Sequence, residues 1–412
     1  MAQKLKFGNG TWATKKGSTL AYNDENNNYK PLPFTTTRNS IATRVNKEGL
    51  IEVVGNDVPR IDYTDSADGV LLLEPQRTNL IEYSEDFSQS SWVKLGVGTG
   101  SAAVVTSNYA ISPDGSQNAS RLQCNLGNGN TVSDQSLIYD SYNLSGSQTI
   151  SIYAKSNNNQ NQTLYFSNTV TYDETDNIVV TNEWKRFEFT HSTSTDVLAI
   201  GLRGGTGSDN VVDVLVWGAQ AEANSVASSY IPTSGSSVTR QADTASGSGN
   251  SEVFNDSQGV IFVDTAALVD DNTSKRISIS DGSSNPNNLV CIDMSEYTNT
   301  IVGRIRTSNS EVAFLQSASQ NQTQKNKIAV KYKVNDFALW INGFEVDTDN
   351  NGAVPIGLND VSFDRGNGSN DFYGKTKEIA YYDEILTDLE LETLTSYRSL
   401  NELVTELNLN TL

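Results

Sequence analysis

The chain has few of the residues that carry most enzyme chemistry, and it has no long apolar segment. Its 412 residues include one histidine, two cysteines and two methionines. His191 has no serine or cysteine nucleophile pattern beside it, so a catalytic triad has little support. No apolar run approaches the ~20 residues of a membrane helix, and residues 1–16 lack the apolar core of a signal peptide. We therefore expect a protein made in the cytoplasm, without membrane insertion, catalytic residues or enzyme activity.

Sulfur ligands and basic residues are also scarce. Cys124 and Cys291 fall on different predicted domains, so we expect two buried thiols, with no disulfide and no cysteine metal site. The 29 Lys and Arg residues face 49 Asp and Glu residues, and the formal net charge is -20. Such a chain repels nucleic acid and anionic membranes at long range. A nucleic-acid partner is therefore not expected.

Turn-forming residues are abundant, whereas hydrophobic residues make up only 36% of the chain. Gly, Ser, Asn and Asp favour turns and compete with helical hydrogen bonding. In the run 185–190, Phe187 and Phe189 alternate with Arg186 and Glu188, which predicts a strand with one buried face. A chain of this length exceeds the size at which a single hydrophobic core keeps growing, so it is expected to divide into domains. The prediction is an all-β protein of two or three domains.

Four regions follow from the distribution of strand-like runs. Residues 1–83 are rich in proline and asparagine turns, and we expect an extended N-terminal anchoring region that cannot fold alone. Residues 84–243 contain many short strand-like runs, which predict an antiparallel sandwich of the jelly-roll type. Residues 244–251, which include ASGSGNS, read as a linker. Residues 252–412 hold a second strand series and a closing helix.

Two local signals are specific within the last region. Residues 337–346 read FALWINGFEV, and Asn342-Gly343 between two apolar runs predicts a tight hairpin. Thr387 and Glu390 form a T-D-L-E capping box, which predicts the start of a short C-terminal helix. The apolar stripe expected on this helix consists of Leu389, Leu394, Tyr397, Leu400, Val404 and Leu407.

Three blocks of sequence carry a resemblance to a known group of proteins. Residues 36–64 read TTRNSIATRVNKEGLIEVVGNDVPRIDYT, residues 71–92 read LLLEPQRTNLIEYSEDFSQSSW, and residues 217–240 read WGAQAEANSVASSYIPTSGSSVTR. These blocks resemble phage tail-fibre or virion appendage proteins, in which a carbohydrate-binding-like jelly roll follows such a junction. Residues 327–346 and the ending KEIAYYDEILTDLELETL resemble a laminin-G or concanavalin-like lectin domain.

The resemblance implies a virion structural protein, a tail fibre or receptor-binding appendage. Such proteins are usually homotrimers, attach to other virion proteins through the N-terminal region, and contact host-surface glycans through lectin-like domains, where multivalency strengthens weak sugar contacts. One alternative is a capsid or tail decoration protein with purely structural sandwiches. Another is a polysaccharide depolymerase with paired carboxylates, although no parallel β-helix repeat is present.

Candidate ligand residues are the aromatic side chains of predicted loops, because loops carry binding functions more often than core strands. Sugar sites pair an aromatic ring with amide or carboxylate groups. We do not take the tryptophans as platforms, since Trp184, Trp217 and Trp340 lie on strand-like runs typical of core positions. The candidates are Tyr139, Tyr142, Tyr172, Tyr297, Phe372 and Tyr373.

Acidic turns offer oxygen ligands for a calcium ion, which needs six to eight of them. The candidates are Asp173, Asp176, Asp347 and Asp349. None of these runs reproduces a twelve-residue calcium loop, and an ordinary solvated turn is the alternative. No cofactor is predicted, and structural calcium is kept as an open alternative because related sandwiches often hold it.

Overall fold

The computed structural model describes residues 3–20, 30–170, 176–192 and 196–406. Most regular structure in these residues is β-strand, and the named strands pair antiparallel, which confirms the all-β prediction. The chain divides into two compact units. Unit 1 comprises Met1–Asn39, Val54–Pro75 and Ala242–Leu412, and unit 2 comprises Ser40–Val53 and Gln76–Gln241.

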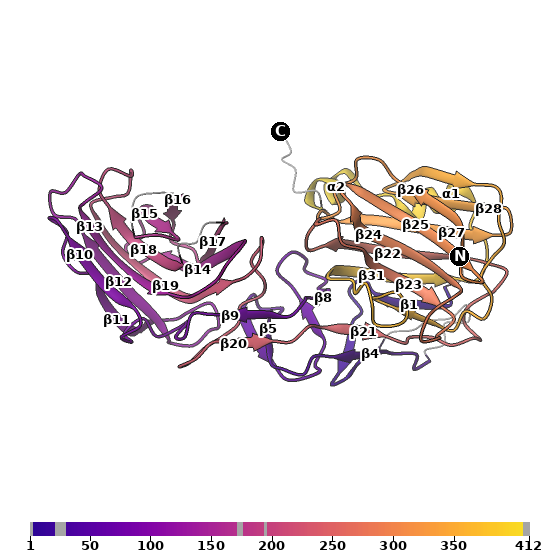
Figure 1. Ribbon diagram of the computed structural model, residues 1–412, viewed down its shortest axis with the longest axis horizontal. Coiled ribbons are helices and arrows are strands. Elements are labelled where there is room, and N and C mark those ends of the chain that lie inside the picture. The colour runs from indigo at the N-terminus through magenta and orange to yellow at the C-terminus, as the bar shows by residue number, and fades with distance from the viewer. Residues whose placement is uncertain (1–2, 21–29, 171–175, 193–195, 407–412) are drawn as a thin grey trace. The chain divides into compact units, whose positions relative to one another are not determined.

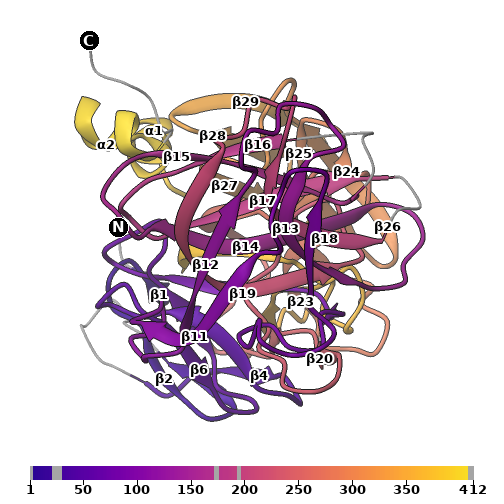
Figure 2. The same ribbon diagram turned by 90° about the vertical axis from the view of Figure 1, so that its left-hand side faces the viewer.

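Unit 2 is a sandwich of two five-stranded antiparallel sheets, which we name by their central strands (Figures 1 and 2). The β18 sheet has the order β10 (Val93–Val97), β13 (Gln135–Ser141), β18 (Val197–Arg203), β15 (Gln162–Ser167) and β16 (Asp176–Val180). The β19 sheet has the order β11 (Val104–Ala110), β12 (Ala119–Asn125), β19 (Val211–Glu222), β14 (Gln148–Ser156) and β17 (Lys185–His191). Fully buried side chains of both sheets form one core, including Leu122, Ile138, Ile152, Phe166, Ile200 and Val214.

The alternation predicted for residues 185–190 is confirmed in β17. Phe187 and Phe189 pack against the core of unit 2, whereas Glu188 is exposed. Arg186 lies on the outer face, where its guanidinium donates to Ser151 Oγ at 2.9 Å. Two short ribbons complete unit 2: β5 (Ala42–Val45) pairs with β6 (Ile51–Val54), and β9 (Arg77–Asn79) pairs with β20 (Val238–Arg240).

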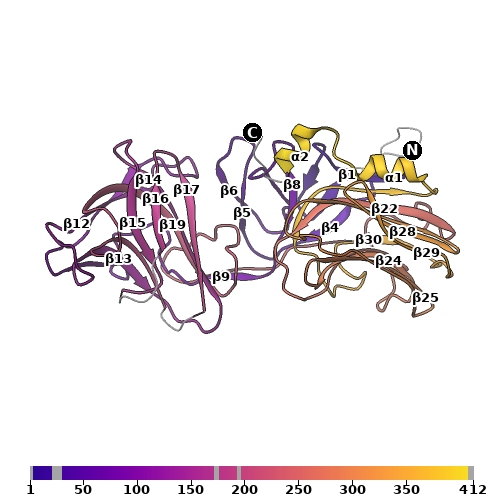
Figure 3. The same cartoon turned by 90° about the horizontal axis from the view of Figure 1, so that it is seen from above.

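Unit 1 is built on an eight-stranded sheet that faces a five-stranded one (Figure 3). The eight-stranded sheet has the order β29 (Phe344–Asp349), β28 (Asp336–Ile341), β27 (Asn326–Lys333), β22 (Gln258–Ala267), β31 (Gly374–Tyr382), β8 (Val70–Leu73) and β7 (Arg60–Asp62), with β1 (Leu5–Gly8) also paired to β31. The β24 sheet has the order β26 (Ser310–Gln316), β25 (Thr300–Thr307), β24 (Leu289–Tyr297), β23 (Lys275–Ser280) and β30 (Asp360–Ser362). The core between them includes Ile261, Ile292, Ile305, Val330 and Leu339.

The structure divides the chain differently from the predicted N-terminal anchoring region. Residues 1–39 and 54–75 belong to unit 1, and residues 40–53 belong to unit 2. β1 pairs with β31, and the Phe34 ring lies 4.6 Å from Phe7 and 5.1 Å from Phe363, measured between ring centroids. Short strands in a turn-rich segment gain their hydrogen bonds and their burial from partners far along the chain. For this reason the sequence of residues 1–83, taken alone, does not indicate a segment that folds by itself.

The predicted linker 244–251 is also part of a sheet. Its first residues form β21 (Thr244–Ser246) in a four-stranded sheet with the order β2 (Ala13–Lys15), β3 (Ser18–Leu20), β4 (Phe34–Thr37) and β21. Ala245 is 2% exposed, and Ser248 exchanges two backbone hydrogen bonds with Val361, at 3.0 and 2.8 Å. Backbone groups make these bonds, so small side chains do not prevent strand pairing.

Both local signals of the last region are confirmed. Asn342 and Gly343 connect β28 to β29 with φ values of 51° and 89°, the left-handed conformation that a tight hairpin turn requires. Helix α1 (Asp388–Thr395) begins with the full capping box, in which Thr387 and Glu390 each bond the backbone of the other. The helix covers the outer face of the eight-stranded sheet through Leu391 (Figure 3).

The prediction of one closing helix with a continuous apolar stripe is wrong, although Leu394 packs against the sheet as expected; Leu407 lies outside the described residues. The chain leaves the helical conformation at Ser396 and forms a second helix, α2 (Leu400–Glu406). Leu389, in the first turn of α1, is 71% exposed because this helix buries Leu391 and Thr395 instead, and Leu400, after the interruption, is 69% exposed. In the part of the chain that the structure describes, no helix is long and apolar enough to cross a membrane.

The two cysteines are free and buried, as predicted. Cys124 lies in the core of unit 2, and Cys291 lies in the core of unit 1. Burial raises the pKa of each thiol to about 12. Since the thiolate is the reactive form, neither side chain is a nucleophile at neutral pH.

Candidate functional site

The β5–β6 ribbon lies against the outer face of the β19 sheet in unit 2. The backbone N–H of Ile51 donates to the carbonyl of Pro113 at 3.0 Å, and the Thr43 hydroxyl donates to the carbonyl of Tyr230 at 2.5 Å. Ile51 is 8% exposed and packs with Trp217 and Tyr230 in a small apolar cluster. The ribbon is therefore an integral part of unit 2.

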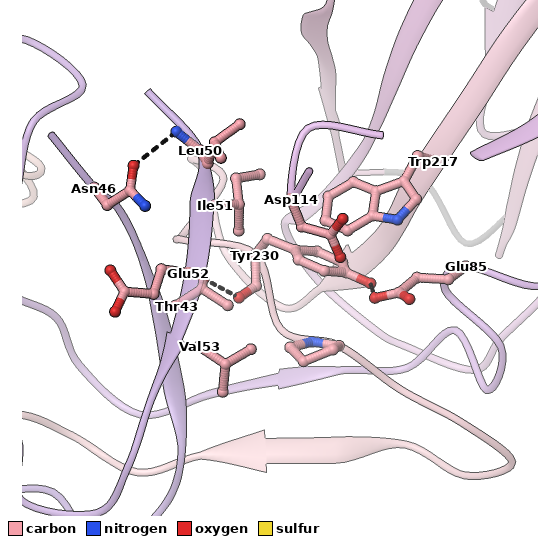
Figure 4. Close-up of a pocket in the computed structure, with 11 residues that line it drawn as sticks. Thr43, Asn46, Leu50, Ile51, Glu52, Val53, Glu85, Asp114, Trp217 and Tyr230 are labelled. Atoms are coloured by element: carbon pink, nitrogen blue, oxygen red, sulfur yellow. Dashed lines mark hydrogen bonds between the residues drawn. The ribbon is translucent and has the colours of Figure 1, made fainter. Parts of the chain in front are cut away.

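A cavity of about 300 Å³ lies between the ribbon and the sheet (Figure 4). The figure shows Asn46 and Glu52 of the ribbon on one side and Glu85, Asp114 and Trp217 on the other. This volume is at the lower end of the range for small-molecule pockets. The cavity is lined by Thr43, Asn46, Leu50, Ile51, Glu52, Val53, Glu85, Asp114, Trp217, Tyr230 and Pro232.

Packed aromatic rings form one wall of this pocket. The centroid of Trp217 lies 4.6 Å from that of Tyr230 and 5.5 Å from that of Tyr153. Gly218 adopts a φ of 64°, and an added Cβ there would lie 3.1 Å from Tyr153, so a bulkier residue would disturb this packing. Trp217 is 1% exposed, and among the described residues its Nε1–H has no hydrogen-bond partner. A buried donor without a partner is costly, so this group stands out among the polar atoms of the wall.

Two carboxylates share one amide at the same wall. Asn118 Nδ2 donates to Glu85 at 2.9 Å and to Asp114 at 3.3 Å. The Tyr230 hydroxyl donates to the other oxygen of Glu85 at 2.8 Å. Asp114 also accepts from the backbone N–H of Ser116 at 2.7 Å, which fixes the turn that carries it. The acceptor groups are thus held in place before any ligand arrives.

Burial and nearby negative charge raise the pKa values of Glu85 and Tyr230 in this wall. Burial raises the pKa of Glu85 above its ordinary value, and the charge of Asp114 adds to the rise, while hydrogen bonds from Tyr230 and Asn118 oppose it. Burial and the nearby charge of Glu85 raise the pKa of Tyr230 well above its ordinary value. The Tyr230 hydroxyl therefore stays protonated at neutral pH and remains a donor.

The charge of the pocket lining has one sign. Glu52, Glu85 and Asp114 line it, and among the described residues no lysine, arginine or histidine does. Arg44 pairs with Glu52 at 3.3 Å without lining the cavity. The described residues contain no group of three or more histidine, cysteine, aspartate or glutamate side chains that could hold a metal ion. The arrangement suits hydrogen bonding to a polar organic ligand.

Unit 1 has a wider cavity, of about 750 Å³, beside α1 and α2 on the outer face of the eight-stranded sheet. Its charged side chains pair with one another: Lys6 lies 3.0 Å from Glu378, and Lys327 lies 2.9 Å from Glu402. A ligand there would have to displace these ion pairs. The unit 2 pocket is for this reason the stronger candidate.

The structure separates the aromatic candidates that were chosen from the sequence. Phe372 is 1% exposed in the core of unit 1, so its prediction as a ligand platform is wrong: its loop folds back, and its backbone N–H donates to the carbonyl of Phe363 at 2.8 Å. Tyr142 is half-buried against the core of unit 2. Tyr297 is 47% exposed. None of these three lines the unit 2 pocket.

The remaining aromatic candidates also lie apart from the pocket. Tyr139 is half-buried and packs on the outer face of the β18 sheet. Tyr373 is half-buried, and its hydroxyl donates to Asp371 at 3.1 Å. Tyr172 lies outside the described residues. The exposed ring of Tyr297 and the half-buried rings of Tyr139 and Tyr373 stay untested predictions.

The calcium candidates do not gather into one site in the described part of the chain. Asp347 accepts from the backbone N–H groups of Gln316 and Thr348, each at 2.9 Å, and Asp349 accepts from that of Asn351 at 2.9 Å. The bonds from Thr348 and Asn351 are local and typical of carboxylates that shape turns, whereas the bond from Gln316 joins Asp347 of β29 to β26. Asp173 lies outside the described residues, and so does the side chain of Asp176; the backbone of Asp176, in β16, pairs with Phe166 of β15.

The pocket residues were missed because each occupies an unremarkable local pattern. Trp217 was assigned to the core, and its burial agrees with that, but its ring also forms a pocket wall. A signal was nevertheless present. Apart from Asp114, every residue that lines the pocket falls within the three blocks 36–64, 71–92 and 217–240. The segments that carry the resemblance are those that fold together around this cavity.

Comparisons with known proteins give only weak similarities. No protein-family model matches the chain, and no curated protein matches it. CBM40 of the Ruminococcus gnavus IT-sialidase is 18% identical over 34% of this chain and 84% of its own, with a TM-score of 0.30. A heptameric SAP-like pentraxin from Limulus polyphemus is 14% identical over 35% of this chain and 71% of its own, with a TM-score of 0.29. Domains LG4-5 of the mouse laminin alpha1 chain are 8% identical over 70% of this chain and 90% of their own, with a TM-score of 0.23. These values define neither a family nor a function.

Fold and site together define an all-β protein with antiparallel sandwiches and a small acidic pocket in unit 2.

Proposed function

We propose that this protein is a glycan-binding structural component of a phage virion, a tail fibre or other receptor-binding appendage. The observation that carries the glycan-binding part is the unit 2 pocket, where buried aromatic rings meet fixed carboxylates. The virion part is supported by the resemblance of the three sequence blocks, which meet at this pocket. In this role the protein acts at the surface of the particle and is made in the host cytoplasm.

The pocket offers each kind of contact that a sugar ring uses. Carboxylate oxygens of Glu85 and Asp114 can accept from sugar hydroxyls, in addition to the protein donors they already hold. The free Nε1–H of Trp217 can donate to a hydroxyl or ring oxygen. Ile51 and Val53 present aliphatic surface to the C–H groups of the ring. Recognition of this type combines apolar contact with a few fixed polar groups.

Attachment to the particle is a further part of the proposal. Residues 3–20 and 30–39 are built into unit 1, so docking through this part of the chain would use a folded surface. β2 is an edge strand of its four-stranded sheet and is exposed at all three positions. Edge strands present unpaired backbone groups that can pair with another chain. A homotrimeric assembly would place three weak sugar sites on one appendage.

A glycan-degrading enzyme is an alternative, because Glu85 has a raised pKa and lies near Asp114. Glycosidases likewise place an acid of raised pKa near a second carboxylate. Both oxygens of Glu85 already accept hydrogen bonds from Tyr230 and Asn118. Asp114 accepts from Ser112, Ser116 and Asn118. These bonds fix the two acids as acceptors, and we therefore propose binding without hydrolysis. A purely structural decoration protein is the other alternative.

The test uses the purified full-length protein on an immobilised panel of host-type glycans. Glu85→Gln is the pocket variant, and Glu188→Gln, on the exposed face of β17, is the matched control. We expect wild type and control to bind the same glycan, and the pocket variant to bind it at least tenfold more weakly. If the protein binds no glycan, the purely structural decoration role is favoured. If it shortens a polysaccharide in solution, it is a glycan-degrading enzyme. Antibody labelling of intact particles in electron micrographs tests the virion part.

A further inference from the structure

The charged side chains that line the unit 2 pocket are all acidic. Glu52, Glu85 and Asp114 line a cavity of about 300 Å³, and Glu85 and Asp114 supply its negative charge, because the Glu52 carboxylate pairs with Arg44 and is turned away from the aromatic wall (Figure 4). No lysine, arginine or histidine of the described residues lines the cavity, so its side-chain donors are uncharged, and Figure 4 shows the unpartnered Nε1 of Trp217 on the ring edge turned toward Glu85. The pocket therefore has acceptors with negative charge and donors without positive charge.

Binding of an anionic sugar would require a compensating cation. Carboxylate or phosphate groups of ligands are usually held by arginine or lysine. Arg44 is engaged with Glu52, with Nη2 at 3.3 Å and Nε at 3.4 Å from the same oxygen, and does not line the cavity. An added negative charge would also lie near Glu85, whose own ionisation is already disfavoured by burial and by Asp114. The charge of the lining would therefore oppose the binding of an acidic sugar.

We propose that the pocket selects its ligands by charge: it takes sugars without an acidic group, binds amino sugars at least as well as neutral ones, and excludes uronic and sialic acids. This inference rests on the proposed glycan-binding function and names the class of ligand. An ammonium group would gain attraction to Glu85 and Asp114 across a partly buried space. A hydroxyl would gain hydrogen bonds only.

Matched sugars that differ in one group test the inference. Methyl hexosides, the corresponding 2-amino-2-deoxy glycosides and the corresponding methyl uronides are compared in the gluco, galacto and manno series. Affinity for the full-length protein is measured by ligand-observed NMR at low and high salt. We expect the uronide of the binding series to bind at least tenfold more weakly than its neutral counterpart, and the amino sugar to bind equally or better. The differences should shrink in high salt, because salt screens charge.

Charge-neutral variants locate the effect in the pocket. Glu85→Gln and Glu52→Gln should each narrow the difference between uronide and neutral sugar, whereas Glu188→Gln on β17 should leave it unchanged. Two independent pocket variants guard against one of them failing to fold. A uronide or sialoside that binds as well as the neutral sugar would overturn the charge selection while leaving glycan binding intact. If no sugar of any charge binds, the proposed function itself fails, and the inference fails with it.

Discussion

Arg60 and Asp243 lie 183 positions apart in the chain and form an ion pair inside unit 1. Arg60 is fully buried, and its second contact is Glu74 at 2.6 Å. Arg38 pairs with the other oxygen of Asp243 at 3.0 Å. Two arginines and two acids thus connect residues 38, 60, 74 and 243 at the place where three segments of unit 1 meet. Buried charge here joins the expected N-terminal anchoring region to Asp243, the last residue of the sandwich expected over residues 84–243.

Breaking this network should strongly destabilise unit 1. Arg60→Met leaves Glu74 and Asp243 buried with one cation fewer, and we expect a loss of about 3–5 kcal/mol in the free energy of unfolding. Denaturant unfolding followed by circular dichroism measures it. The control is Lys375→Met, which removes a solvent-exposed ion pair with Asp65 and should cost about 0–1 kcal/mol. Equal effects of the two substitutions would contradict the role of the buried network.

The N-terminal strand should contribute directly to the stability of unit 1. Phe7 is fully buried beside Phe34, so Phe7→Ala should cost about 3–5 kcal/mol in denaturant unfolding. Phe344 is 72% exposed, and Phe344→Ala should change stability by no more than about 0.5 kcal/mol. If residues 1–39 served only as an anchor, the Phe7 substitution would leave the unfolding of unit 1 unchanged.

Two tyrosines chosen from the sequence as ligand candidates should respond differently to truncation. Tyr142 is half-buried against the core, and burial raises its pKa above the ordinary value. We expect Tyr142→Ala to cost about 1–3 kcal/mol and to lower the melting temperature. Tyr297 is 47% exposed, and Tyr297→Ala should leave the melting temperature nearly unchanged. A stable Tyr142→Ala protein would show that this ring is free for a ligand after all.

The raised pKa of Glu85 predicts how stability depends on pH. Below its ordinary pKa, Glu85 is protonated in both the folded and the unfolded chain, so burial carries no charge penalty. As the pH rises through the raised folded pKa, the folded state must hold a buried charge that water would solvate better, and stability falls. Glu85→Gln removes this penalty.

The measurement for Glu85 is the difference in melting temperature between Glu85→Gln and wild type. We expect this difference to favour the variant more at pH 7 than at pH 4. The control is Glu188→Gln, for which the difference should not change with pH. A variant that loses stability relative to wild type as the pH rises would show that the bonds from Tyr230 and Asn118 outweigh the cost of burial.

Local patterns determined several elements before any tertiary contact was known. The Asn342-Gly343 turn requires a left-handed backbone that these two residues adopt at little cost. The capping box of Thr387 and Glu390 closes within four residues. The alternation of Phe187 with charged neighbours predicts a strand, β17, with one buried face. These signals sufficed for the all-β class, because turn chemistry and side-chain period act within a few residues.

The candidate site could not be predicted in the same way. The pocket is lined by residues from three distant segments, including Thr43, Glu85, Trp217 and Tyr230. The sequence around any one of them does not indicate that the others lie beside it. The loop position of Phe372 suggested exposure, but the fold of the loop buries it. The resemblance marked the right blocks, while only the structure brought them to one cavity.

The sequence by itself determined the strand-rich class, the hairpin, the helix start and the two buried thiols. The tertiary structure decided that residues 3–20 and 30–37 supply strands to unit 1, that Asp243 pairs with Arg60, and that an acidic pocket forms in unit 2. The physical reason is the range of the interactions. Turns and caps are formed by neighbours in the chain, whereas sheet pairing and buried ion pairs depend on which distant backbone and which distant charge the fold places alongside.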